Sequence, residues 1–141
     1  RAILAGLSAG SEIICAELCI EMGFEVKVYL PLADSNYVRE FISPAGEGWV
    51  DRFYKIRNHP LVDEINELEA LGQPNEGDDL FERNNRWALY SALGRGGISK
   101  MRLLTVANET VFSNDRDIQL TRHMIELMRD MGGVVDFINP S

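Results

Sequence analysis

The chain of 141 residues has little cysteine, and its two cysteines are Cys15 and Cys19. They lie four positions apart in one apolar stretch, which places them one turn apart on the same face of a helix. Such a pair does not form the disulfide framework of a small secreted domain, and no histidine or further cysteine lies nearby in the sequence to complete a zinc site. We therefore expect two reduced thiols in the core of a cytoplasmic protein, and no bound metal.

Long apolar runs are also missing, because no stretch has the length of a transmembrane helix or the layout of a signal peptide. Basic residues are few: 14 Lys and Arg against 22 Asp and Glu give a net charge of -8, and they are scattered along the chain. A nucleic-acid surface needs a field that attracts phosphate. We therefore expect neither a membrane nor a nucleic acid as a partner.

The length and the 45% hydrophobic content suit one domain with a proper core, so residues 1–141 are expected to form a single domain. The chain does not begin with Met and enters an apolar, strand-like run at once. We therefore expect an excerpt of a longer protein that lacks an upstream first strand and carries additional domains.

Strand and helix patterns alternate along the sequence. A strand over 2–5, a helix over 12–22 closed by Gly23 and a strand over 25–30 predict a right-handed βαβ unit with parallel strands. Residues 61–65 are either a short strand or a turn. The remaining expected elements are helices over 35–42, 48–57, 78–93 and 117–131, strands over 101–106 and 134–138, and a polar loop after residue 106. The pattern predicts an open, mainly parallel α/β sheet.

The first turn of this pattern, Gly6 to Gly10, matches the G-x-S-x-G motif that presents the nucleophilic serine of a hydrolase. A serine nucleophile needs a histidine base, and the candidates are His59, in a loop before a proline, and His123, inside the last helix. Neither position suits a hydrolase, so we expect that Ser8 is not an activated nucleophile.

The same loop also suits a phosphate or nucleotide, because it is expected at the carboxyl end of a parallel strand and opens a helix. Gly6 and Gly10 permit positive φ and close approach, and Ser8 and Ser11 offer hydroxyl groups. The alternative is structural: the glycines make a tight turn and Ser11 caps a helix.

Three further polar residues carry two interpretations each. Glu17 lies in an apolar helix one and a half turns from the loop, and it is either an acid, base or glycosidic nucleophile or a partner in a salt bridge. Asn84 and Asn85 lie beside the apolar stripe of their helix, where amides need hydrogen-bond partners. They either fix the backbone of a neighbouring loop or bind a base or ribose.

The helix over 12–22 is apolar nearly all round, so it is expected to be buried on more than one side. Its excess apolar face must meet an upstream segment or a second copy of the chain. We expect a homodimer, since closed two-fold pairs are the commonest assemblies of soluble proteins.

Three stretches resemble one family. "GLSAGSEIICAELCIEMGFEVKVYLPL" resembles the glycine loop, helix and strand of bacterial SLOG-type Rossmann-like domains, "ERNNRWALYSAL" their Asn-Asn-x-Trp helix, and "TRHMIELMRDMGG" their Thr-x-His-Met helix. The resemblance implies a Rossmann-like three-layer sandwich that binds a nucleotide-derived ligand. By position it implies a ligand loop, a helix glutamate and paired amides, which are Gly6, Ser8, Ala9, Gly10, Ser11, Glu12, Glu17, Asn84 and Asn85.

We therefore expect a sensor or regulatory domain that binds a nucleotide or nucleotide-derived signal, without a cofactor and without catalytic residues. The alternative is an N-glycosidase-type hydrolase acting on nucleotides, with Glu17 or Glu12 as the working carboxylate. A third interpretation is a scaffold or dimerisation module.

Overall fold

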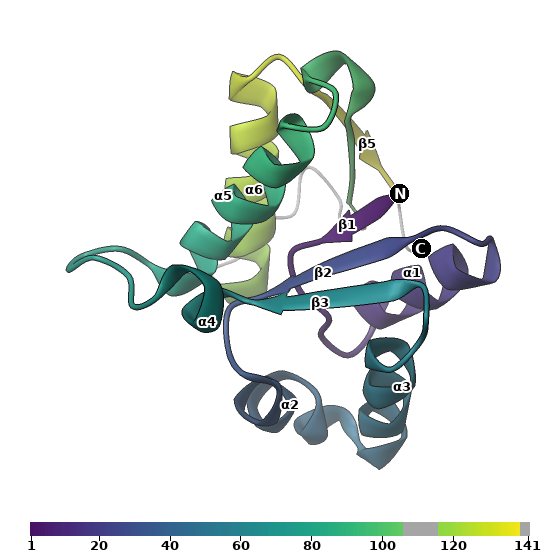
Figure 1. Cartoon of the computed structure of the whole chain (residues 1–141). Coiled ribbons are helices and arrows are strands. Elements are labelled where there is room, and N and C mark those ends of the chain that lie inside the picture. The colour runs from purple at the N-terminus through teal and green to yellow at the C-terminus, as the bar shows by residue number, and fades with distance from the viewer. Residues whose placement is uncertain (106–115, 139–141) are drawn as a thin grey trace. The chain divides into compact units, whose positions relative to one another are not determined.

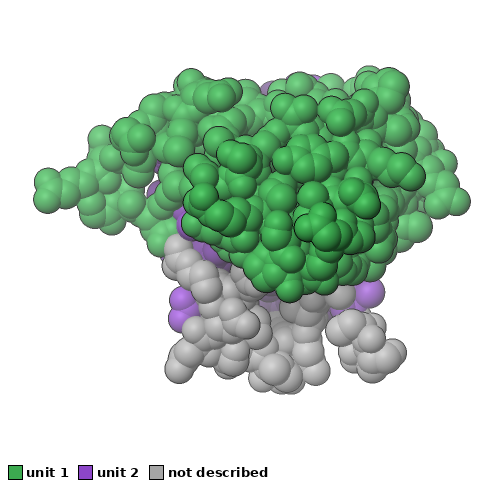
Figure 2. All heavy atoms as spheres, turned by 90° about the horizontal axis from the view of Figure 1, so that it is seen from below, with its two compact units in different colours: residues 1–80 green, residues 81–141 purple. Residues whose placement is uncertain are grey.

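A computed structural model describes residues 1–105 and 116–138. The chain has an α/β fold with parallel strands, and it divides into two compact units, residues 1–80 and residues 81–141 (Figure 2). Each unit contains its own small parallel sheet. The expected α/β class with parallel strands is therefore confirmed.

The first unit is built on a three-stranded parallel sheet of β1 (Ala2–Leu4), β2 (Val26–Leu30) and β3 (Val62–Asn66), in the order β1-β2-β3. Ala2 pairs with Val26, and Val28 pairs with Glu64. The first βαβ unit is confirmed, and the undecided run near residue 61 is a strand.

The helices α1 (Ser11–Glu21), α2 (Asp34–Phe41) and α3 (Glu47–Arg57) lie on the same side of this sheet (Figure 1). The strands follow one another across the sheet in chain order, so right-handed crossovers place every connecting helix on one face. That face holds the hydrophobic core, where Val28 and Phe53 are fully buried.

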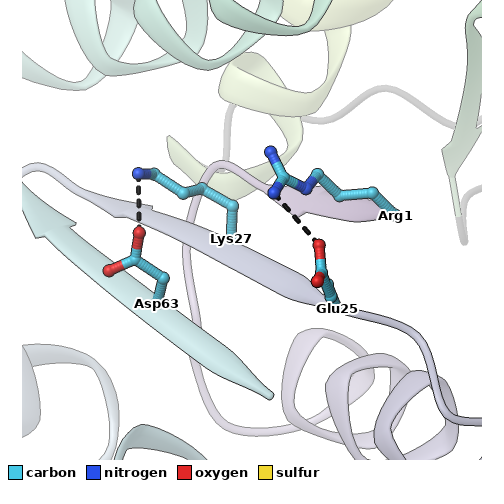
Figure 3. A network of polar contacts seen from close by, with 4 residues as sticks. All are labelled: Arg1, Glu25, Lys27 and Asp63. Atoms are coloured by element: carbon cyan, nitrogen blue, oxygen red, sulfur yellow. Dashed lines mark hydrogen bonds and ion pairs between the residues drawn. The ribbon is translucent and has the colours of Figure 1, made fainter. Parts of the chain in front are cut away.

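By the two-residue period of a strand, the other face of the three-stranded sheet carries Lys27 and Asp63 together with Tyr29, which is buried, and Ile65. Lys27 Nζ lies 2.8 Å from Asp63 Oδ2, directly across the β2–β3 pair, and Arg1 lies 3.1 Å from Glu25 (Figure 3). Asp63 and Glu25 are largely exposed. Such ion pairs contribute little to stability, so the packed face determines the fold.

A short helix that the sequence analysis did not anticipate, α4 (Glu67–Leu71), follows β3 directly. Its five residues are too few to show a helical period, but Asn66 marks its start. The Asn66 side chain accepts hydrogen bonds from the N–H groups of Leu68 and Glu69, which is the contact of an N-cap.

The second unit contains the helices α5 (Leu80–Leu93, which begins at the boundary) and α6 (Arg116–Asp130) and the parallel pair β4 (Arg102–Thr105) and β5 (Val134–Phe137). These elements agree with the sequence pattern within two residues at each end. The polar loop expected after residue 106 lies outside the described residues. No helix among the described residues is long and apolar enough to cross a membrane.

Candidate functional site

The glycine loop lies at the carboxyl end of β1, between the end of that strand at Leu4 and the start of α1 at Ser11. The neighbouring parallel strand β2 ends at the same edge and leads to α2. In open parallel sheets ligands bind at this edge. The position predicted for the loop is therefore confirmed.

Gly10 is the N-cap of α1, with φ of 105° and ψ of -130°. This conformation is strained for any residue with a Cβ, so glycine is required here. The Gly10 carbonyl accepts the first helical hydrogen bond from the Ile14 N–H at 3.0 Å. Because it is a glycine, this N-cap residue has no side chain that could cap the helix start. The first-turn N–H groups, which have no carbonyl of their own helix to bind, thus face the loop.

Gly6 lies in close contact with two side chains. A Cβ at this position would lie 2.6 Å from Glu12 Oε2 and 3.0 Å from the Tyr37 hydroxyl oxygen. The Ser8 hydroxyl donates a hydrogen bond of 2.5 Å to Glu12 Oε1. The Glu12 carboxylate is therefore folded back into the loop, over Gly6 and against Ser8.

The helix α2 holds the loop in place through two backbone contacts. The Leu7 N–H donates to the Tyr37 hydroxyl at 2.8 Å, and the Ala9 N–H donates to the Phe41 carbonyl at 3.4 Å. Tyr37 is buried, so its hydroxyl is fixed by the core. The sequence analysis missed Tyr37, because nothing in the local pattern links it to a loop about thirty positions earlier.

Glu17 points toward α3, where both its carboxylate oxygens accept hydrogen bonds from Arg52. The guanidinium of Arg52 also lies 4.3 Å from the centre of the Trp49 ring. These hydrogen bonds lower the pKa of the Glu17 carboxyl, so it stays ionised and holds no proton to donate at neutral pH. Of the two interpretations of Glu17, this geometry favours the salt bridge.

Asn84 and Asn85 are buried in α5, in the second unit. The Asn85 amide donates to the Leu120 carbonyl of α6 at 3.1 Å and lies 3.2 Å from His123 Nδ1. Asn85 therefore binds a backbone carbonyl, as in the structural interpretation, but that carbonyl belongs to a helix rather than to the expected loop. The residues that the structure brings together in the first unit are those of the loop: Gly6, Ser8, Ala9, Gly10, Ser11 and Glu12.

A cluster of charged side chains that the sequence analysis missed lies on the packed face of β3. Glu64 occupies a position that faces the helices, where its side chain is 13% exposed. Arg57, at the end of α3, pairs with Glu64 at 2.9 Å and also with Asp34, the first residue of α2. Burial, and then a hydrogen bond with Asp34, raise the pKa of Glu64 to about 8. The sequence signal for this cluster was the position of Glu64, two residues after Val62, which places both side chains on the same face of a strand.

Cys15 and Cys19 are free thiols in α1 and each is half-buried; Cys19 packs against the hydrophobic core, so the expectation of core thiols holds in part. Ile14 and Leu18, the residues before them on the same helix, are exposed. Burial, the neighbouring Cys19 and the carboxylate of Glu12 raise the pKa of Cys15 to about 11. Cys15 is therefore a protonated thiol at neutral pH and a poor nucleophile.

We predict that fluorophosphonate probes do not label Ser8. Its hydroxyl is bound to Glu12, and His59 precedes β3 at the opposite edge of the sheet, roughly 16 Å away by the length of a five-residue strand. His123 lies in the second unit, where Asn85 contacts its Nδ1. Mass spectrometry of the treated protein should show no adduct. An adduct that disappears in Ser8→Ala would contradict this prediction.

Comparison of the chain with known protein families, with curated proteins and with solved structures finds no match. The function of the chain is therefore inferred from the geometry of the loop and from the residues that form it.

Proposed function

We propose that the chain binds a nucleotide or nucleotide-derived signalling ligand at the loop from Gly6 to Ser11, as a sensor or regulatory domain. The observation that carries the proposal is the start of α1 at Gly10. There an eleven-residue helix begins at a glycine, which has no side chain to cap it, at the carboxyl edge of a parallel sheet. Backbone N–H groups and the helix dipole favour an anionic group at such a position.

The loop offers different partners to the two polar parts of a nucleotide. The first-turn N–H groups of α1 suit a phosphate oxygen, which accepts hydrogen bonds. The Glu12 carboxylate, now bound by the Ser8 hydroxyl, is an acceptor suited to sugar hydroxyl groups. A ligand with both a phosphate and a ribose can use both partners, whereas a simple anion uses only the N–H groups.

A sensor fits the geometry better than the N-glycosidase alternative. Glu17, one candidate for the working carboxylate, is bound by Arg52 on α3. Glu12 remains in the loop, where its carboxylate accepts the hydrogen bond of the Ser8 hydroxyl. We therefore keep binding without turnover as the proposed activity, and place it in the reducing cytoplasm, where two free thiols are stable.

One observation favours a homodimer as part of this function. Ile14, Leu18 and Met22 follow one another at intervals of four along α1 and are 43%, 52% and 64% exposed. This stripe is the excess apolar face that the sequence predicts, and an exposed apolar stripe of this kind is typical of an interaction surface. Light scattering that shows a monomer at high concentration would count against the dimer.

Two glycine substitutions test the binding proposal. Gly10→Ala places a Cβ on a backbone with φ of 105° and should distort the helix start. We expect isothermal titration calorimetry to show at least tenfold weaker binding of AMP or ADP-ribose. Gly48→Ala is the matched control, because Gly48 lies within α3 without positive φ and no heavy atom of the described residues lies within 4 Å of the added Cβ.

Equal binding by both variants, or no binding by the unmodified chain, would refute the proposal. Chromatography of the same mixtures separates a sensor from an enzyme. Release of adenine from AMP that disappears in Glu12→Gln would establish the N-glycosidase alternative instead.

A further inference from the structure

Asp34, Arg57 and Glu64 form a charge cluster in the first unit, and each comes from a different element. Nε of Arg57, the last residue of α3, lies 2.9 Å from Glu64 Oε2 on β3. The same nitrogen atom is paired with Asp34 Oδ2 at the start of α2. The two carboxyl groups therefore share one guanidinium and are neighbours of each other. Asn58 adds a neutral acceptor, with its Oδ1 3.3 Å from Nη1 of Arg57.

The surroundings of Glu64 determine how much charge the cluster can hold. Opposite Glu64 on β2 lies Val28, which is fully buried and carries no charge. Beyond the end of β3, the helix α4 carries two carboxyl groups, those of Glu67 and Glu69, and so brings no positive charge. The Glu64 side chain is only 13% exposed, so salt and water do little to screen it. One guanidinium therefore serves two carboxyl groups.

This ratio gives the cluster two charge states. The pKa of Glu64 is about 8, so at neutral pH the folded chain keeps this carboxyl protonated and Arg57 faces the single charge of Asp34. When the pH rises above that value, the proton passes to solvent and two carboxylates face one guanidinium. Like charges repel each other, most strongly where burial limits the screening. Ionisation of Glu64 therefore weakens the ion pair that fixes Asp34.

The helix α2 connects the cluster to the glycine loop. It has eight residues and begins at Asp34, so the cluster holds its first turn. One turn later the Tyr37 hydroxyl accepts from the Leu7 N–H at 2.8 Å, and at the end of the helix the Phe41 carbonyl accepts from the Ala9 N–H at 3.4 Å. The cluster and both loop contacts thus lie within about 12 Å along one helix. A shift at the start of α2 therefore reaches both contacts.

We propose that the cluster of Asp34, Arg57 and Glu64 is a proton-operated switch that positions the glycine loop through α2. In the protonated state Arg57 pairs with Asp34 alone, α2 is fixed at its start, and its two contacts hold the loop. In the ionised state Arg57 is shared, the start of α2 loosens, and both loop contacts weaken. Such a switch is a local change of charge that shifts the balance between two arrangements of one element. Its effect on ligand binding rests on the proposed function, but its effect on the free loop does not.

The test follows the backbone amide signals of the 15N-labelled chain in two-dimensional NMR between pH 6 and pH 9, without ligand. The Ile65 amide, next to Glu64, should report the ionisation of that carboxyl. We expect the signals of Leu7 and Ala9 to shift with the same midpoint, near pH 8. In Glu64→Gln none of the three signals should shift near that pH, because the side-chain amide does not titrate. Asp63→Asn is the matched control and should keep all three shifts, since Asp63 lies on the other face of β3.

Tyr37→Phe tests the connection through α2, because it removes the hydroxyl that binds the Leu7 N–H and keeps the ring in the core. Ile65 should still shift in this variant, whereas the shift of Leu7 should be lost. Circular dichroism checks that each variant is folded, and if Tyr37→Phe is not, the unmodified chain and Glu64→Gln decide alone. A titration of Ile65 that Leu7 and Ala9 do not follow in the unmodified chain would overturn the switch. So would the absence of any titration of Ile65 near pH 8.

Calorimetry with AMP tests the consequence for binding. Between pH 7 and pH 9 the affinity of the unmodified chain should fall about fivefold, the lower end of ordinary coupling between two sites. Glu64→Gln should lose at most about twofold over the same range, and the ionisation of AMP itself affects both proteins equally. An equal fall in both proteins would overturn the regulation of binding by the cluster. No AMP binding by either protein would refute the proposed function, while the amide signals of the free chain still decide on the switch.

Discussion

Replacing Phe53 with alanine is expected to lower the free energy of unfolding by about 3–5 kcal/mol, the usual cost of removing a buried aromatic ring. Phe53 is fully buried at the centre of the first unit's core. Its ring stacks on Tyr37 with centroids 6.3 Å apart, and Tyr37 in turn holds the Leu7 N–H of the glycine loop. The substitution therefore removes both core packing and the support of the loop.

Tyr54→Ala is the control for this substitution, since it removes an aromatic ring from the next position of the same helix. Tyr54 is 38% exposed, although its ring meets Phe53 edge-on with centroids 5.1 Å apart. We expect Tyr54→Ala to lower the free energy of unfolding by about 1 kcal/mol, mostly through the loss of that ring contact. Urea unfolding followed by circular dichroism measures both variants. Equal losses would show that Phe53 does not lie at the centre of the core.

The second large effect is a dependence of stability on pH that comes from Glu64. The pKa of this carboxyl is about 8 in the folded chain, against an ordinary value of 4.5, so the folded chain holds a proton that the unfolded chain has released. Stability therefore falls as the pH rises from about 4.5 to about 8. If the whole pKa shift counted, the free energy of unfolding would fall by about 1.4 kcal/mol for each pH unit in this range. Because Arg57 in this cluster is partly exposed to solvent, we expect the free energy of unfolding to fall by only about 2 kcal/mol between pH 5 and pH 8.

Glu64→Gln should remove this contribution, because an amide does not titrate. Asp63→Asn is the control, since Asp63 is the adjacent residue of β3, points to the other face of the sheet and is largely exposed. In urea unfolding at several pH values, the free energy of unfolding should fall less steeply with rising pH for Glu64→Gln than for the unmodified chain. For Asp63→Asn it should fall as steeply as for the unmodified chain. The same decline in all three proteins would contradict the buried position of Glu64.

The sequence predicted those features whose cause is local. The apolar run before Gly6, the glycines of the loop and the β-branched run of β2 predicted the βαβ unit and the edge at which the loop lies. It could not show that Gly6 lies against Glu12 and Tyr37, because the contact with Tyr37 depends on how α2 packs against the loop.

Contacts between distant segments explain the other differences. In the sequence alone, Glu17 is a candidate acid. In the fold, Arg52, which lies thirty-five positions later on α3, donates hydrogen bonds to its carboxylate. Similarly, Glu64 lies in a strand with a weak apolar pattern, and its environment depends on the ends of α2 and α3. Both carboxylates were ambiguous in sequence because their partners belong to other elements of the fold.

The central claim is that the loop from Gly6 to Ser11 and the first turn of α1 bind a nucleotide. The most direct measurement is a titration of the 15N-labelled chain with AMP, followed through the backbone amide signals in two-dimensional NMR. If the loop binds AMP, the largest shifts occur at the amides of Ala9 to Ile13, and they saturate as AMP is added. Saturating shifts confined to amides of the second unit, or no shifts at millimolar AMP, would contradict it.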